Sequence, residues 1–442
     1  MPKAGRLSDW MWGFFVFALM VAYWPHVAGV ATTPRWDVAT FLVIIMFFGP
    51  VARDTTAHWL GLAPLCWMGL TILWNDGGHD GRLDGVEALF ELMIGLMAFW
   101  MGSTLFDIRP VLVGAAIGIG VNSTFCIAQW FGWDGWQGLI QTREDSFAGL
   151  FYEKDRLAAA TAMVTVGLVA LPRLWILLPL LLPALWLAHS RAAWLAIGIS
   201  LVVQVYRMTN PYVRQLKPFL AMLLVPVVVT IFVHFIANPD QSTLERLAIW
   251  HDTILNLNLF GHGLGSFREV FLQKAHFYDF GHWQHRPEAP HNELLWLAFE
   301  GGIPAIVLAG IFSIAVVYKS EANDGIGVLV CLAVLCMFAM PLHDPSTLVL
   351  GALYAGYVAS CGARARELAD TRRNAICAGM AAERNQRQYE RFAGRSAVLP
   401  VPAAVSRRDG EKAGNLCTDR KMSGEEIHDS DIDRLKRYGS NW

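Results

Sequence analysis

Long apolar runs follow one another along most of the chain. Runs long enough, or nearly long enough, to cross a bilayer lie near 10–30, 37–52, 57–74, 86–106, 110–131, 157–171, 174–189, 191–206, 217–236, 296–318, 325–341 and 345–361. A membrane-spanning helix needs about 20 apolar residues, and such a helix satisfies its own backbone hydrogen bonds in hydrocarbon. The pattern predicts an all-α polytopic membrane protein with about 12 transmembrane helices, which fill a domain of residues 1–361.

This pattern breaks between Asn238 and Gly302. The polar segment there carries three arginines and many histidines, namely Arg246, Arg268, Arg286, His251, His262, His276, His282, His285 and His291. Hydrocarbon does not accommodate such groups cheaply. We therefore predict a long loop over 237–291, between spans 9 and 10, and expect the chemistry of the protein at that membrane face.

The distribution of positive charge predicts the orientation of the spans. An even number of spans puts both termini on one side, and the short connections on that side are basic, with Lys3, Arg6, Arg53, Arg109, Arg173, Arg207, Arg214, Lys217 and Lys319. Basic loops stay in the cytoplasm. We expect both termini to be cytoplasmic and the long loops to lie outside. Residues 362–442 read as a cytoplasmic, largely disordered tail, with a charged helix from about Arg364 to Arg395.

Composition narrows the class of protein. Hydrophobic residues make up 55% of the chain and charged residues 16%, against about 25% charged in soluble domains. The mildly basic tail gives no sign of nucleic-acid binding, and the seven cysteines show neither a disulfide framework nor a metal-ligand spacing. Few ionisable groups lie inside the spans, which argues against an ion-coupled transporter.

Three short stretches stand out as candidates for chemistry. The first, Ala188–Trp194, places Arg191 at the mouth of a span, where it either snorkels to the interface or binds an anion. The second contains Arg246 and Trp250 and then the glycine-rich run Gly261–Gly265, which predicts a tight turn packing against a lipid headgroup. Clustered cations at one membrane face would attract a phosphate or pyrophosphate.

The third stretch, Pro290–Pro304, puts His291 where the polar segment re-enters the membrane. A histidine held by a neighbour can take a proton from a hydroxyl near neutral pH. The alternative is a structural or merely solvated loop histidine. A metal site at His276, His282 and His285 matches no ligand spacing, so no metal is expected.

Together these stretches resemble the O-antigen ligase and polymerase superfamily of bacterial membrane glycosyltransferases. The matching residues are Ser190-Arg191, Arg246 with Trp250 ahead of Phe260–Phe267, and His291-Asn292-Glu293-Leu294-Leu295 ahead of Glu300-Gly301-Gly302. A further similar segment, Gly149–Ala158, has Asp155 where the family commonly has asparagine, which leaves the role of that position open.

The resemblance implies a GT-C-type helical fold and a metal-independent, inverting transfer of glycan from an undecaprenyl-pyrophosphate-linked donor, without a cofactor. It implies that Arg191 and Arg246 hold the pyrophosphate and that His291 is the general base. Further substrate-binding candidates are Lys154, Arg156, Trp250 and Asn292. Tryptophans such as Trp250, Trp283 and Trp296 either stack on sugars or anchor the membrane interface.

The implied setting is the bacterial inner membrane, with the active site facing the periplasm and with membrane lipids as partners. The acceptor is the lipid A-core for a ligase of lipopolysaccharide biosynthesis, or a growing glycan for a polysaccharide polymerase. We favour the ligase over the polymerase, and over a protein O-oligosaccharyltransferase or a transporter of lipid-linked sugars.

Overall fold

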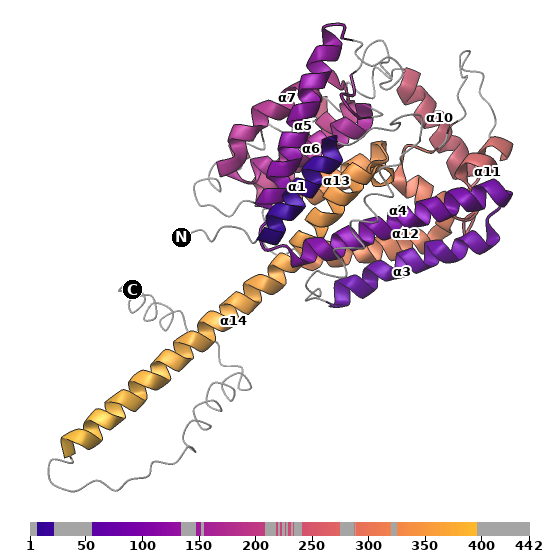
Figure 1. The fold of residues 1–442 in the computed structure, drawn as a ribbon. Helices are drawn as coiled ribbons and strands as arrows, with labels where there is room; N and C mark the ends of the chain where they lie inside the picture. The colour runs from indigo at the N-terminus through magenta and orange to yellow at the C-terminus, as the bar shows by residue number, and fades with distance from the viewer. Residues whose placement is uncertain are drawn as a thin grey trace. The chain divides into compact units, whose positions relative to one another are not determined.

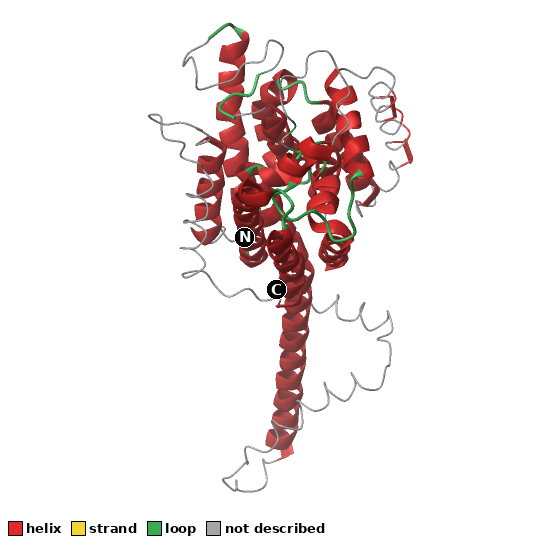
Figure 2. Cartoon of the chain, turned by 90° about the vertical axis from the view of Figure 1, so that its right-hand side faces the viewer, coloured by secondary structure: helices red, strands yellow, loops and turns green. Residues whose placement is uncertain are grey.

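The computed structural model describes residues 7–21, 55–133, 147–151, 154–207, 241–274, 287, 289–319 and 325–395, with a few isolated positions between 218 and 233. These residues form helices joined by loops, with no strand among them (Figure 2). The elements are α1 (Leu7–Val21), α3 (Thr55–Thr71), η1 (Ile72–Trp74), α4 (Gly78–Thr104), α5 (Arg109–Trp130), α6 (Lys154–Val169), η2 (Pro172–Leu177), α7 (Leu178–Leu187), α8 (Arg191–Arg207), α10 (Gln241–Leu255), α11 (Phe267–Lys274), α12 (Glu293–Lys319), α13 (Ile326–Phe338), η3 (Pro341–His343) and α14 (Pro345–Arg395).

Most predicted apolar runs that fall within the described residues coincide with helices. Among the described residues, three helices are long and apolar enough to cross a membrane, namely Gly78–Thr104, Arg109–Trp130 and Glu293–Tyr318, and shorter apolar helices accompany them. The run predicted over 174–189 divides into η2 and the ten-residue α7, with Pro179 at the start of α7 and Pro183 inside it. A proline inside a helix removes one backbone hydrogen bond. The runs at 37–52 and 217–236 lie largely outside the described residues. The described part of the chain is thus that of an all-helical membrane protein.

One group of helices surrounds the main apolar core. In this group α5 packs against α1, α6 and α7, while α8 packs against α6 and α13. The crossing of α1 and α5 is very close, because a Cβ added to Gly13 would overlap Pro110 and one added to Gly114 would overlap Gly13. Small residues at such crossings let two backbones approach, which favours helix association in lipid.

A second group contains α3, α4 and α12, which run side by side (Figure 1). The indole of Trp67 on α3 donates a hydrogen bond of 2.7 Å to the carbonyl of Gly301. That carbonyl lies where α12 is kinked, because Gly302 has φ of 69° and ψ of −168°. The kink frees the carbonyls of Phe299 and Glu300 from the helix, so that the loop before α11 can bind them.

Contacts between Cα atoms divide the chain into Met1–Ala363 and Arg364–Trp442. Within the first unit, the start of α14 lies against α4: the backbone of Leu353 adjoins Gly102, and Gly356 adjoins the backbone of Phe99. In the second unit, α14 continues to Arg395, so a helix occupies the segment where the charge pattern predicted one.

The glycine-rich run Gly261–Gly265 packs against protein, and the expectation that it packs against a headgroup is wrong. The N–H groups of His262 and Gly263 donate to the carbonyls of Phe299 and Glu300, at 2.8 and 2.9 Å. The buried carboxylate of Glu300 in turn accepts the N–H groups of Gly265 and Phe267, at 2.9 and 3.0 Å. Backbone N–H groups of this loop thus bind both the free carbonyls and a buried carboxylate of α12.

Replacement of Gly265 by alanine is expected to lower the free energy of unfolding by about 2–4 kcal/mol. Gly265 has φ of +82°, and a Cβ there would overlap the backbone of Gly81 and Gly85 on α4. Thermal unfolding of the detergent-solubilised protein measures the loss. Gly310→Ala on α12 is the matched control, because nothing lies within 4 Å of its added Cβ. Equal midpoints for the two variants would contradict this account of the loop.

Candidate active site

Several of the described candidate residues gather around the segment Met337–Asp344, which we call the α13–α14 junction. It contains the end of α13, the turn η3 and the residue before α14. Side chains from α6, α10 and the start of α12 bond to it, although these helices are far apart in the sequence. Helices α6, α12 and α14 all begin here, and the N-terminal end of a helix favours negative charge.

Arg246 on α10 joins α6 to the junction. Its guanidinium donates to the carbonyl of Phe338 at 2.9 Å and to the carboxylate of Asp155 at 2.8 Å. The side chain is partly buried, with 23% of its surface exposed. Two of the five N–H donors of a guanidinium make these bonds. The guanidinium is thus held in place, and its remaining N–H groups can donate hydrogen bonds to an anion.

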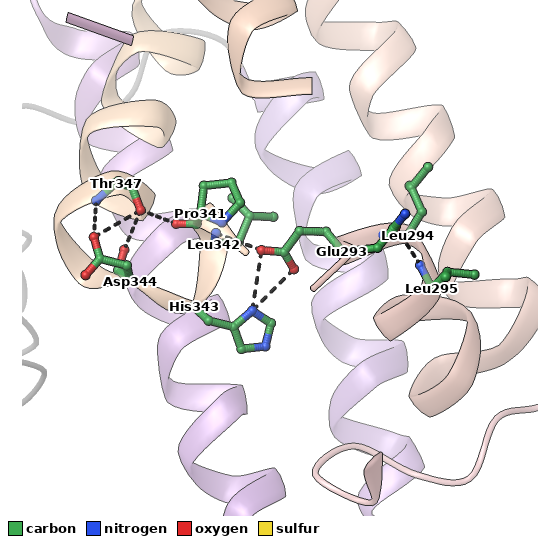
Figure 3. Close-up of polar contacts among 9 residues, drawn as sticks. Glu293, Leu294, Leu295, Pro341, Leu342, His343, Asp344 and Thr347 are labelled. Atoms are coloured by element: carbon green, nitrogen blue, oxygen red, sulfur yellow. Dashed lines mark hydrogen bonds and ion pairs between the residues drawn. The ribbon is translucent and has the colours of Figure 1, made fainter. Parts of the chain in front are cut away.

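The residue after Asp155 reaches the same junction. Arg156 lies with a terminal nitrogen 3.9 Å from the carboxylate of Asp344, which is fully buried. Asp344 also caps α14, since its other oxygen accepts the N–H of Thr347 at 3.0 Å (Figure 3). The proline at the first position of α14 suits this cap. Adjacent residues of α6 therefore form two ion pairs, Asp155 with α10 and Arg156 with the residue before α14.

Glu293 connects the start of α12 to the turn η3. One carboxylate oxygen accepts the N–H of Leu342 at 2.8 Å, and the other lies 3.3 Å from Nδ1 of His343 (Figure 3). The ring centroids of Trp296 and His343 lie 4.4 Å apart, and the two ring planes are nearly perpendicular. Burial alone would lower the pKa of His343, but the charge and hydrogen bond of Glu293, with the charges of Glu91 and Glu300, raise it above its ordinary value.

His291 and Asn292 lie immediately before α12. Asn292 is buried; its amide donates to the carbonyl of Met337 at 3.0 Å, and its oxygen caps α12 by accepting the N–H groups of Leu294 and Leu295. The indole of Trp250 donates to the carbonyl of Pro290 at 2.7 Å. Hydrogen bonds on both sides therefore hold the exposed His291 in place. These bonds give Asn292 and Trp250 positioning roles, and their contact with substrate stays a prediction.

His291 itself has a left-handed backbone. Among the described residues, His189 and His291 are the two non-glycine residues with positive φ, at 49° and 51°. Such conformations cost about 1–3 kcal/mol and cluster at functional sites. His189 lies two residues before Arg191, so both outliers fall in stretches that the sequence singled out.

Arg191 and Lys154 begin α8 and α6, and both side chains are half-buried. Helix α8 packs against α6 and α13, the helices that carry Asp155 and lead into the junction. The structure thus brings together Arg156, Arg246 and the His291 segment. The convergence of Arg191 on the same point stays a prediction.

The remaining candidates of the polar segment lie in different surroundings. His262 is buried, and its ring nitrogens lie 2.8 Å from the carboxylate of Asp76 and 2.8 Å from the carbonyl of Asn256, so its role is structural. Trp296 is 5% exposed and has no open face for a sugar. Trp283 and the histidines weighed as metal ligands, His276, His282 and His285, lie outside the described residues. Within the described residues, no group of three or more His, Cys, Asp or Glu side chains could hold a metal ion.

Sequence reasoning missed Asp155 as a partner of Arg246, and it missed Glu293, His343 and Asp344. The capping residues before α12 and α14 were a usable signal, because Asn or Asp before a helix start is favoured.

The comparisons with known proteins concern the same region. No curated protein matches the chain. The family model described as O-antigen ligase matches residues 175–310, a range that contains Arg191, Arg246 and His291. This match over part of the chain supports the resemblance to the O-antigen ligase and polymerase superfamily.

Proposed function

We propose that the protein is a membrane glycosyltransferase that moves a glycan from an undecaprenyl-pyrophosphate-linked donor to an acceptor hydroxyl on the periplasmic face. One observation carries the proposal: a forked arginine, Arg246, and the strained histidine His291 are both fixed to the α13–α14 junction. Arg246 is bonded to Phe338, while Asn292, next to His291, is bonded to Met337. A cation for the leaving group and a base for the acceptor thus belong to one rigid frame.

The chemistry requires little more than these groups. A pyrophosphate-linked donor brings its own leaving group, so the protein has mainly to stabilise the departing negative charge. Arg246 can bind non-bridging oxygens in a forked geometry, and we assign Arg191 and, less directly, Arg156 and Lys154 to the same anion. His291 would take the proton of the acceptor hydroxyl as the oxygen attacks the anomeric carbon. Attack opposite the leaving group inverts that centre, and the reaction needs no metal.

The strained backbone of His291 supports its assignment as the base. A left-handed histidine persists only if its surroundings hold it, and here the neighbouring Pro290 and Asn292 are both bonded to other helices. A solvated loop histidine would not need such support. Histidine tolerates this conformation better than most residues.

The finer assignments follow from the family match and the charge pattern. We propose the bacterial inner membrane as the location, with about twelve spans in a GT-C-type arrangement, both termini cytoplasmic, and the polar segment 237–291 periplasmic. The lipid A-core is our preferred acceptor, which makes the protein an O-antigen ligase. A polymerase that uses a second donor as acceptor is the alternative, because donor chemistry is common to both.

Reconstitution in lipid vesicles tests this proposal. Purified protein is given one undecaprenyl-linked donor and one of three acceptors: lipid A-core, a second donor molecule or a pilin-like protein. We expect transfer to lipid A-core and release of undecaprenyl pyrophosphate. Transfer to the second donor alone would instead establish a polymerase, and absence of release with every acceptor would contradict the proposed chemistry.

The same assay tests independence from metal. Exhaustive EDTA treatment is expected to leave the rate of transfer unchanged, because arginines supply the positive charge that a divalent ion supplies elsewhere. A loss of activity restored by one divalent ion would overturn this part of the mechanism.

A further inference from the structure

The side chain of Glu293 lies in an unusual place for a carboxylate. It belongs to the first residue of α12, two positions after His291, and is 2% exposed. The N–H of Leu342 supplies one hydrogen bond, and Nδ1 of His343 lies 3.3 Å from the second oxygen. The thiol of Cys336 on α13 is a further titratable group near this carboxylate. A buried carboxylate is expensive unless a positive charge compensates it. The imidazole of His343 can provide that charge when it is protonated.

The surroundings of His343 favour its protonated form. On α12 it faces Glu293 and Glu300, and on α4 it is influenced by Glu91. Helix α6 brings Arg156 to the neighbouring residue, where Asp344 pairs with it. The ring of Trp296, one turn into α12, packs perpendicular to the imidazole. The imidazole therefore extends from η3 onto the first turn of α12, with carboxylates of α12 and α4 around it.

We propose that His343 and Glu293 are a positioning pair, in which the imidazolium of His343 holds the first turn of α12, and with it His291, against the α13–α14 junction. This inference rests on the proposed function for its catalytic consequence. Glu293 and His291 belong to one short segment, whose intervening residue Asn292 is bonded to Met337. Loss of the charge on His343 would leave the carboxylate uncompensated and loosen that segment. A shift of about 1 Å in a catalytic group can lower a rate roughly a hundredfold.

The sign of the pH dependence follows from the raised pKa of His343. A group whose pKa is higher in the folded protein stabilises the fold fully below its unfolded pKa, about 6.5 for histidine. This stabilisation is lost as the pH rises through the folded value. Both the unfolding temperature and kcat are therefore expected to fall on the alkaline side.

The test compares wild type, His343→Gln and Glu293→Gln across a pH series from 6 to 9. In glycan transfer, His343→Gln should lower kcat roughly tenfold to a hundredfold at pH 6, remove the alkaline fall that depends on His343, and leave the donor KM little changed. Glu293→Gln should move the alkaline fall to lower pH, because the imidazolium loses its partner. The double variant should lose less than the product of the two single losses.

Thermal unfolding of the same proteins gives a readout that does not depend on transfer. Between pH 6 and 9, the unfolding temperature of the wild type should fall further than that of His343→Gln, even if the proposed reaction is absent. Glu293→Gln supplies the measurement if His343→Gln does not fold. The matched control is His79→Gln, since His79 also neighbours a carboxylate, at 3.4 Å, but is 84% exposed. The positioning pair would be overturned if His343→Gln and Glu293→Gln both kept the wild-type fall of kcat on the alkaline side and if their unfolding temperatures changed with pH as the wild type's does.

Discussion

Alanine in place of His291 is expected to reduce glycan transfer by roughly a hundredfold to ten-thousandfold, the usual contribution of a general base. The variant should still bind donor, because the arginines assigned to the pyrophosphate are unchanged. Transfer is measured in vesicles with saturating donor and acceptor, and donor binding is measured separately with the same vesicles. The expected pattern is a large fall in kcat with little change in the dissociation constant of the donor.

The backbone of His291 requires a second variant, because alanine is poorly suited to φ of 51°. Asparagine accepts the left-handed conformation but cannot act as a base near neutral pH. His291→Asn should therefore fold with wild-type stability and be as inactive as His291→Ala. Transfer by His291→Asn at the wild-type rate would remove the histidine from the mechanism.

Much of the fold follows from local features of the sequence. The apolar runs predict the positions of helices such as α5 and α12 within a few residues, since hydrophobic length alone defines them. The kink at Gly302 and the contact of Gly13 with Gly114 do not follow in this way. They depend on which backbone lies opposite each glycine, and one sequence carries no record of that pairing.

The candidate site shows the same division. Arg191, Arg246 and His291 stand out because charge and histidine are rare beside apolar spans. Asp155 does not, because its partner Arg246 is 91 residues away in the sequence. The packing of the glycine-rich run was mispredicted for a related reason: the carboxylate of Glu300, which accepts the N–H groups of Gly265 and Phe267, is 35 and 33 residues away from them in the sequence.

Arg246→Ala is expected to lower kcat/KM for the glycan donor by roughly a hundredfold to a thousandfold. This is the usual cost of removing one hydrogen-bonding group that faces developing negative charge. Arg246→Lys should recover part of the donor binding but little of the transfer, because an ammonium cannot reproduce the fork. Arg268→Ala is the matched control. Arg268 belongs to the same polar segment but is exposed on α11, so its loss should leave transfer near the wild-type rate.

Asp155 distinguishes a binding role of Arg246 from a structural one. Asp155→Asn keeps an oxygen that can accept the 2.8 Å hydrogen bond from Arg246, but it removes a negative charge from beside the anion. If Arg246 binds pyrophosphate, this variant should tighten the binding of inorganic pyrophosphate, by roughly threefold to tenfold, while Arg246→Ala weakens it. If Arg246 only joins α10 to α6 and α13, both variants should lower the unfolding temperature and neither should tighten binding. Opposite effects on pyrophosphate affinity therefore assign the arginine to the donor, because a purely structural ion pair has no means of producing them.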